Sequence, residues 1–564
     1  MASIVKKIKK GHPYYYAIQS ARVDGKPRIV WQKYLGTIET IVQRTDQAKP
    51  PKPKESVIFE AGGVAALLRI TQKLGLLELI DEIVPKREQG PSLGHYLVLA
   101  AINRALAPCS KVCIADWYEQ TVLRRLWRFP KTVFSSQRFW DHMDMVSETA
   151  IDTIQKKLAP LIKQHFGLDG RVLLYDTTNF FTYLATTNNR CTVAKRGHSK
   201  AKRHDLRQVG LALLVTRDFH VPLFHRVYDG NIPDITLFPK LAKELTKHYD
   251  EVFCASAEAT LVFDKGNVCE DAMELLIAAK KHFVAALSAN RVTDLLAVPI
   301  DQFQNVTGLP GTQACIADTT FWDTKCRAVV VYTESFFTQQ LCGVTNNLVK
   351  CQKKLMDLEK RLRTWREGKT RGKRPTSRSV QANVRTILAP QFMNELFHIS
   401  IEQEQGIPLL LRYKVDHTAL DKLVNERLGR TVLVTDHLDW TPHEIISAYR
   451  NLASIEEAFK NMKNIHFLRW QPAYHWTNQK LKVHGFYCVL ALLLATLAHK
   501  IAVQSGCDFT IINLLKELND LREVAVIYPQ GTLAHRKDYI TLTRMSSQQK
   551  KLAKIFKIEQ LLDG

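Results

Sequence analysis

Hydrophobic residues in this chain follow two periods, and the change between them divides the sequence. Between about residues 57 and 165, apolar residues recur at helical spacing, most clearly in Gly62–Leu77 and Leu93–Leu106. From Arg171 onward they form short continuous runs that are typical of buried strands. The pattern therefore predicts a helical region followed by an α/β region.

The α/β region is predicted from strand-like runs that alternate with helical segments. The predicted strands are 171–176, 208–216, 221–227, 259–264 and 282–288, and the predicted helices are 233–248 and 267–281. Three consecutive strands followed by helix, strand, helix and strand predict a sheet of mixed direction.

The N-terminal segment has the pattern of a small β unit. Strand-like runs at 14–23 and 27–34 are joined by Asp24-Gly25, a hairpin signal. The lysines between residues 6 and 10 fit a DNA-contacting arm and a solvated tail equally well. Residues 47–55 are rich in proline and lysine and predict a linker.

Residues 300–435 interrupt the α/β pattern. Strands are predicted at 314–332, 397–402, 409–414 and 431–435, with a charged helix at 348–365 and a densely basic loop at 361–378. A long apolar helix, predicted at 476–499, is expected to be buried. His475 and His484 are predicted to be packed or hydrogen-bonded residues.

One predicted helix carries an aligned set of polar residues. Its apolar residues recur at helical spacing after Thr441-Pro442. Tyr449, Glu456 and Lys463 are seven residues apart, so they lie along one stripe. We interpret Glu456 as a metal ligand with phosphate-binding neighbours, while a surface helix with a solvated acid fits this segment equally well.

Composition narrows the class of partner. The chain has 564 residues, enough for three or four structural units, and a formal charge of +24 that favours nucleic acid over an anionic membrane. It has no apolar run of about 18 residues and no signal-peptide core, so we expect a cytoplasmic protein. Its 11 scattered cysteines indicate reduced thiols and disfavour a zinc site.

Two aspartates stand at the ends of apolar strands. Asp176 and Asp264 each follow such a run, and ligands bind at strand ends in open α/β sheets. Paired carboxylates repel each other when ionised, and a divalent cation bound by oxygen ligands, Mg²⁺ or Mn²⁺, removes that repulsion. With Glu456 from a later helix they would form a two-metal site for phosphoryl transfer.

Together these residues resemble the DDE transposases of prokaryotic insertion sequences, in the branch with a Tyr-x2-Arg-x3-Glu-x6-Lys signature. Here the signature reads Tyr449-x2-Leu452-x3-Glu456-x6-Lys463, with Leu452 where that branch often has arginine. The resemblance covers about residues 56 to 500. It includes 175–179, 197–210, 229–231 and 262–267.

The resemblance implies an α/β, RNase H-like mixed sheet with helices, interrupted by a mainly β insertion. It implies that Asp176, Asp264 and Glu456 are catalytic and hold two Mg²⁺ or Mn²⁺ ions, and that Tyr449 and Lys463 contact the phosphate at the transposon end. It also implies a homodimer that binds double-stranded DNA at terminal inverted repeats, cleaves it and joins the 3′-OH to target DNA. Glu457, rotated about 100° from Glu456, is expected to be solvated.

Further DNA contacts are predicted in two basic loops. Lys200 and Arg203 lie in the first, near Asp176 in sequence. Arg371, Lys373 and Arg374 lie in the second and would give salt-dependent affinity for any DNA sequence.

The expected organisation has six parts. Residues 1–55 form the β-hairpin unit and linker, 56–165 a helical DNA-binding or assembly domain, 166–300 the first part of the catalytic core, 301–435 the insertion, 436–500 the second part of the core, and 501–564 a helical, dimerising C-terminal region. Two alternatives stay open: an RNase H-like nuclease or resolvase without strand transfer, and a non-catalytic DNA-binding protein derived from a transposase.

Overall fold

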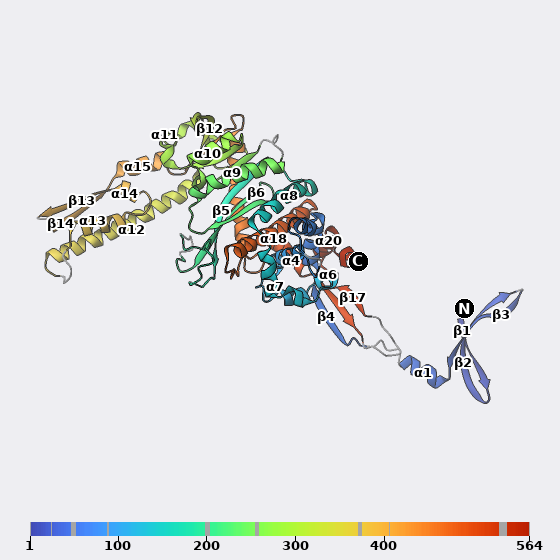
Figure 1. The fold of residues 1–564 in the computed structure, drawn as a ribbon. Helices are drawn as coiled ribbons and strands as arrows, with labels where there is room; N and C mark the ends of the chain where they lie inside the picture. Colours follow the sequence, from blue (N-terminus) through green and yellow to red (C-terminus); the bar gives the residue numbers. More distant parts are fainter. Residues whose placement is uncertain are drawn as a thin grey trace. The chain divides into compact units, whose positions relative to one another are not determined.

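The computed structural model forms two compact units (Figure 1). Unit 1 contains Met1–Arg69, Val112–Ser135 and Ile501–Gly564, and unit 2 contains Ile70–Lys111 and Ser136–Lys500. The structure describes residues 2–23, 25–46, 52–86, 89–185, 187–197, 203–253, 259–369, 375–404, 407–528 and 538–562. Each unit is described by itself.

A nine-stranded sheet organises the described part of unit 2, in the order β10-β11-β12-β15-β9-β8-β5-β6-β7. Its strands are β5 (Val172–Thr182), β6 (Arg207–Thr216), β7 (Pro222–Asp229), β8 (Thr260–Phe263), β9 (His282–Leu287), β10 (Gln304–Asn305), β11 (Thr312–Phe321), β12 (Thr324–Thr333) and β15 (Arg430–Thr435).

The first five of these strands form the predicted mixed sheet. β5, β6 and β7 are antiparallel neighbours, while β8 and β9 run parallel to β5. In sheet order they are the third, second, first, fourth and fifth strands of the core, as expected for an RNase H-like fold. β6 is buried along nearly its whole length because protein covers both faces of the sheet, which explains its continuous apolar run.

Helices pack on this core. α8 (Glu148–Phe166) contacts β7, and α9 (Asp234–Phe253) contacts α8 and α10 (Glu270–Ala278). α18 (Asn478–Gln504) is the one helix in the described chain that is long and apolar enough to cross a membrane. Because 83% of its most apolar window is buried within the protein, it serves here as the predicted core helix.

The predicted insertion contributes strands to the same sheet. β11 and β12 form a hairpin, and β12 pairs antiparallel with β15, which pairs with β9. Predicted strands 314–332 and 431–435 therefore extend the core sheet instead of lying in a separate domain.

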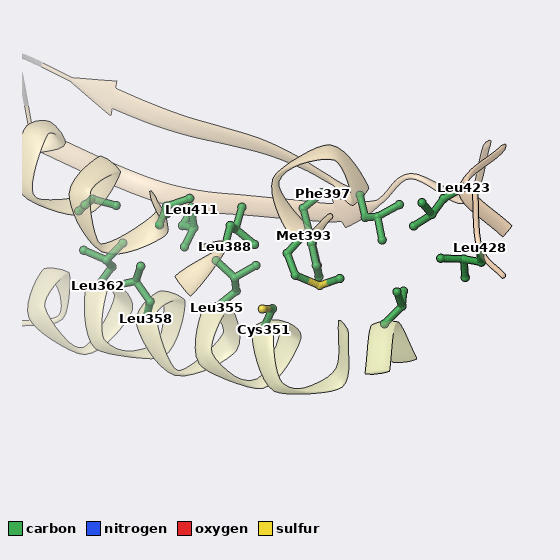
Figure 2. Close-up of a cluster of buried hydrophobic side chains, with 14 residues drawn as sticks. Cys351, Leu355, Leu358, Leu362, Leu388, Met393, Phe397, Leu411, Leu423 and Leu428 are labelled. Carbon is green, nitrogen blue, oxygen red and sulfur yellow. The ribbon is translucent and has the colours of Figure 1, made fainter. Parts of the chain in front are cut away.

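The rest of the insertion forms a module of its own, residues 334–429, which we call the insertion module. It contains α12 (Glu334–Arg366), α13 (Ser377–Ile387), α14 (Met393–Leu396), β13 (Phe397–Glu404), β14 (Ile407–Val415) and α15 (His417–Glu426). Leu355, Leu358 and Leu362 line the face of α12 that points toward Leu411 of β14 and Leu388 (Figure 2). The longest element is a helix, so the prediction of a mainly β insertion describes only part of this region.

Unit 1 begins with a three-stranded antiparallel sheet of β1 (Ala2–Lys9), β2 (His12–Val23) and β3 (Lys26–Gly36), followed by α1 (Ile38–Asp46). The hairpin at Gly25 was predicted, whereas the lysine-rich start was not recognised as a strand. Lys7 donates a 3.1 Å hydrogen bond to Gln32 and lies 5.0 Å from the ring centre of Tyr16, so this lysine is held against the sheet.

A second sheet of unit 1 joins distant segments. β4 (Glu55–Glu60) and β17 (Tyr539–Leu542) flank β16 (Arg522–Ile527). The predicted linker therefore ends where β4 begins, and residues 47–51 lie outside the described residues. The pairing is supported by ion pairs, 3.2 Å between Arg522 and Glu60 and 2.7 Å between Arg125 and Glu523.

The remaining helices agree with the predicted ranges only in part. α4 spans Leu93–Leu106 as predicted and is capped by Ser92. The helix predicted over Gly62–Leu77 is instead α2 (Gly62–Lys73) and α3 (Leu76–Ile83), because Gly75 adopts a positive φ of 58°. The others are α5 (Ile114–Glu119), α6 (Leu123–Trp127), α7 (Ser136–Asp144), α11 (Thr293–Leu296), α19 (Ile511–Asn519), α20 (Ser547–Ile555) and α21 (Ile558–Leu562).

Candidate active site

Asp176 and Asp264 occupy matching positions on adjacent parallel strands. The register pairs Val172 with Thr260 and Leu174 with Val262. Continuing this register by two residues sets Asp176 opposite Asp264, on the same side of the sheet as the Leu174 and Val262 side chains. Both aspartates are half-buried. The sequence prediction that two strand-end carboxylates lie side by side thus agrees with the register.

The helix predicted to carry Tyr449, Glu456 and Lys463 is divided. α16 (Pro442–Arg450) and α17 (Leu452–Met462) meet at Asn451, whose φ of −63° and ψ of −20° keep the backbone close to helical. Thr441 caps α16, as the Thr-Pro start predicted. Its side-chain oxygen accepts a hydrogen bond from the Glu444 N–H, and the Glu444 carboxylate accepts one from the Thr441 N–H. α16 packs against β8, β9 and β15, and α17 packs against β5.

Tyr449 connects α16 directly to Asp264. Its hydroxyl donates a 2.8 Å hydrogen bond to Oδ1 of Asp264. Burial, with Asp264 and Asp176 nearby, raises the pKa of Tyr449 well above its ordinary value. Tyr449 therefore remains a protonated donor at neutral pH. The resemblance implies a phosphate contact for this hydroxyl, whereas in the structure it donates to a carboxylate.

Lys463 makes the matching contact at the other end of the stripe. Its Nζ donates a 2.8 Å hydrogen bond to Thr178 Oγ1, on the strand that carries Asp176. Because side chains alternate along a strand, Thr178 and Asp176 face the same side. Glu456 is exposed and lies midway in sequence between Tyr449 and Lys463, which both contact the aspartate strands.

The arginine position of the signature is filled differently. Leu452 is buried in the core. Arg450 donates a 2.7 Å hydrogen bond to Thr312 of β11, so its guanidinium is not available to the stripe. Glu457 is exposed, also as predicted.

The family to which this site belongs is shown by sequence comparison. The model of the transposase DDE domain family matches residues 167–493, which include the sheet, the insertion, α16 and α17. The chain belongs to this family. The predicted resemblance is thereby confirmed at the level of the DDE transposases, and the insertion-sequence branch stays a prediction.

Other comparisons of this DDE transposase family member add little. No protein of curated function matches its sequence. The cryo-EM structure of the piggyBac transposase synaptic complex with hairpin DNA shares 10% identity with it, over 80% of this chain and 79% of that chain. The TM-score is 0.36, and a likeness at this level carries no argument about function.

The donor atoms of the DDE site suit the metal that the family implies. Asp176, Asp264 and Glu456 offer carboxylate oxygens, the ligands that Mg²⁺ and Mn²⁺ prefer. Asp176 and Asp264 are half-buried acids of like charge at the ends of neighbouring strands, and the Tyr449 hydroxyl donates to Asp264. A divalent cation would neutralise that repulsion, so the ligand chemistry fits the ion. Among the described residues, the group whose ligand atoms all lie within 4.8 Å of one another is a different one, His282, Asp436 and His437.

The predicted DNA-contacting lysines and arginines of this DDE domain are only partly placed. Lys200, Arg371, Lys373 and Arg374 lie outside the described residues. Arg203 is described, and its guanidinium makes two 2.8 Å hydrogen bonds to Asp205, which lowers the pKa of Asp205 to about 2.

Lys195 and Arg196, in the first of the basic loops predicted to contact DNA, line a basic hollow beside the end of β5. It has a volume of about 530 Å³ and is lined by Asn188, Asn189, Cys191, Thr192, Ala194, Lys195, Arg196 and Arg207. Lys195 forms a 2.6 Å ion pair with Asp229. Two hydrogen bonds join segment 183–188 to segment 473–476: the Tyr183 N–H donates to the Ala473 carbonyl, and Asn188 donates to the Trp476 carbonyl. These two segments carry the exposed rings of Tyr183, Tyr474 and Trp476.

The aromatic residues had a signal in the sequence. Segment 470–476 contains two tryptophans, a tyrosine and a histidine within an otherwise polar loop. Trp470 and His475 are buried, whereas Tyr474 and Trp476 are exposed, and single-sequence reasoning could not separate the two groups.

His475 and His484 are packed residues, as predicted. They form a 3.0 Å hydrogen bond to each other, and His484 Nε2 bonds the Trp470 carbonyl at 2.7 Å. Complete burial lowers the pKa of His475 to about 3 and lowers that of His484 well below its ordinary value. Both are neutral at physiological pH.

Proposed function

We propose that this protein is the DNA transposase of an insertion sequence. It binds terminal inverted repeats, cleaves DNA by two-metal phosphoryl transfer and joins the freed 3′-OH ends to target DNA. Asp176, Asp264 and Glu456 are its catalytic residues and hold two Mg²⁺ or Mn²⁺ ions. The proposal rests on one observation: the stripe that carries Glu456 contacts Asp264 at one end and the strand of Asp176 at the other.

The position of Glu456 follows from those two contacts. Tyr449 and Lys463 stand seven residues on either side of it, and seven residues are close to two helical turns. A side chain midway between them faces the same side of the helix pair. We therefore propose that Glu456 faces the aspartate strands and that Glu457 does not.

Each neighbouring residue has a distinct role in this proposal. Tyr449 holds the Asp264 carboxylate in place by its hydrogen bond, and Lys463 supplies a positive charge for a DNA phosphate. The bound ions would activate the attacking water or 3′-hydroxyl and stabilise the departing oxygen.

DNA is the partner that the charge of the chain favours. The net charge of +24 suits a polyanion, and the basic hollow offers Lys195, Arg196 and Arg207 beside exposed aromatic rings. Joining two transposon ends in one complex requires two active sites, so we propose a homodimer on DNA, acting in the cytoplasm.

The test combines purified protein, transposon-end DNA, a target plasmid and Mg²⁺. Asp176→Asn, Asp264→Asn and Glu456→Gln should each abolish cleavage and joining, because each removes a charged oxygen ligand, while DNA binding persists. Glu457→Gln is the matched control, since it changes the adjacent exposed acid, and it should retain activity.

The same assay separates the alternatives. Full activity in all three variants would refute the site. Cleavage by the unchanged protein without any joined product would indicate a nuclease or resolvase. DNA binding without cleavage would indicate a non-catalytic DNA-binding protein.

A further inference from the structure

A second group of metal-ligating side chains lies at the opposite end of β8 from the catalytic aspartates. His282 is the first residue of β9, and Asp436 and His437 directly follow β15. Asp264 follows the last residue of β8, whereas Thr260, its first residue, contacts His437. The four residues of β8 span roughly 13 Å, so the two groups are separate sites.

The three side chains are held in place by the strands around them. Asp436 Oδ1 accepts a 3.0 Å hydrogen bond from the Phe283 N–H, and its Oδ2 lies 2.8 Å from His282 Nδ1. The buried His437 ring stacks between His282, at 4.2 Å, and Trp440, at 4.1 Å. These contacts fix the side-chain orientations without any metal.

The ligand atoms are close enough for one small ion. His282, Asp436 and His437 each offer an atom within 4.8 Å of the others. Two ligands of a tetrahedral zinc ion lie about 3.3 Å apart, given bond lengths near 2.0–2.1 Å. On binding an ion, the three would have to move from separations of up to 4.8 Å to that distance and exchange their present hydrogen bonds for metal bonds. Asp439 Oδ1, 4.0 Å from His437 Nδ1 on an exposed side chain, is within reach as a fourth ligand.

We propose that His282, Asp436 and His437 bind a structural zinc ion that fastens β15 to β8 and β9. Two imidazoles and a carboxylate form a ligand set for zinc, whereas Mg²⁺ and Mn²⁺ select oxygens. In the sequence, the scattered cysteines disfavoured any zinc site, but those cysteines have no bearing on a site built from histidine and aspartate. The ion would hold the far end of β15, the strand on which the chain returns from the insertion module to the core sheet.

Cobalt(II) is the probe for this site, because it replaces zinc and absorbs visible light when it is tetrahedral. The full-length protein is stripped with a chelator and titrated with Co²⁺, then with Zn²⁺. We expect about one tetrahedral Co²⁺ per chain, displaced by Zn²⁺, and a higher thermal midpoint in Zn²⁺. A stripped protein that shows neither the absorption nor the midpoint shift would overturn the proposal.

Variants assign the signal to these residues. His282→Gln and His437→Gln should each lose the absorption, and circular dichroism checks that each variant is folded. His282 is only half-buried, so its substitution is the milder of the two. His165→Gln, which changes an exposed histidine on α8, should keep the signal.

A double variant separates this site from the catalytic one. Asp176→Asn with Asp264→Asn should still bind tetrahedral Co²⁺, since those oxygens belong to the other end of the sheet. Absorption that persists in both His282→Gln and His437→Gln, or that disappears in the aspartate double variant, would place the ion elsewhere.

Discussion

Tyr449 has the most constrained side chain of the candidate active site. It donates to a carboxylate that is proposed to bind metal, and burial together with the two aspartates raises its pKa and keeps it protonated. Its contribution is to position Asp264, because its hydrogen bond removes one rotational freedom of that carboxylate. Leu452 has the opposite character, since it is buried and contributes packing where related signatures carry a charge.

Tyr449→Phe should slow DNA cleavage by about tenfold to a hundredfold, because a hydrogen bond to a charged group contributes about 1.5–3 kcal/mol. The measurement is the single-turnover cleavage rate on transposon-end DNA, together with DNA affinity, which should change little. Tyr539→Phe, on an exposed tyrosine of β17, is the control and should cleave normally. Equal rates for both variants would remove Tyr449 from the site.

At the scale of elements, the hydrophobic pattern predicted which strands are buried, but it could not predict which strands pair with each other. The core strands β5 to β9 were found because buried strands leave continuous apolar runs. The pairing of β12 and β15 links residues about a hundred positions apart, and nothing local specifies it. The break at Asn451 was hidden because α16 and α17 keep the same apolar period.

The candidate site, too, was predictable only where local sequence patterns specify it. Strand ends located Asp176 and Asp264, and helical spacing located Glu456. The hydrogen bond from Tyr449 to Asp264 and the His282, Asp436 and His437 group arise from tertiary contacts between segments more than 150 residues apart, so the sequence alone could not show them.

The insertion module has its own core, and one pair of neighbouring residues on α12 tests it. Leu355 is fully buried, whereas Met356 is 52% exposed. Leu355→Ala should destabilise the module by about 2–5 kcal/mol, because it removes buried methylenes and leaves a cavity. Met356→Ala should change stability by less than about 0.5 kcal/mol.

Amide hydrogen exchange measures the difference in stability between the two variants within the insertion module itself. Amides of α12 and β14 should exchange faster in Leu355→Ala, while those of β5 and β6 remain protected. Uniform loss of protection across the sheet would mean that the module does not open independently.

At the scale of the whole molecule, buried neutral histidines make stability depend on pH. Burial lowers the pKa of His225 and His475 to about 3, and lowers that of His484 strongly. Unfolded histidine titrates near pH 6.5, so the unfolded chain binds these protons first. The contribution to stability is complete above pH 6.5 and is lost as the pH falls toward 3.

The thermal midpoint should therefore be lower at pH 5 than at pH 7. Over this range each buried histidine should reduce the free energy of unfolding by about 1–2 kcal/mol. His225→Gln, which can keep a hydrogen bond to Gln155, should reduce this slope. His165→Gln should leave it unchanged, because that histidine is exposed in the folded protein. A midpoint that does not move across this range would show that these histidines are protonated in the folded state.

The chain leaves the sheet after Thr333 and returns at Arg430, on strands that are direct antiparallel neighbours. Thr333 N–H also donates to the Gly429 carbonyl, 3.1 Å away, so exit and return are in contact. Topologically, the insertion module is therefore an oversized hairpin loop. The entropy of closing a loop grows only slowly with its length, by about 0.6 kcal/mol per doubling. The sheet can accordingly tolerate modules of very different size at this position, and a short turn in place of residues 334–429 would leave every strand pairing of the sheet intact.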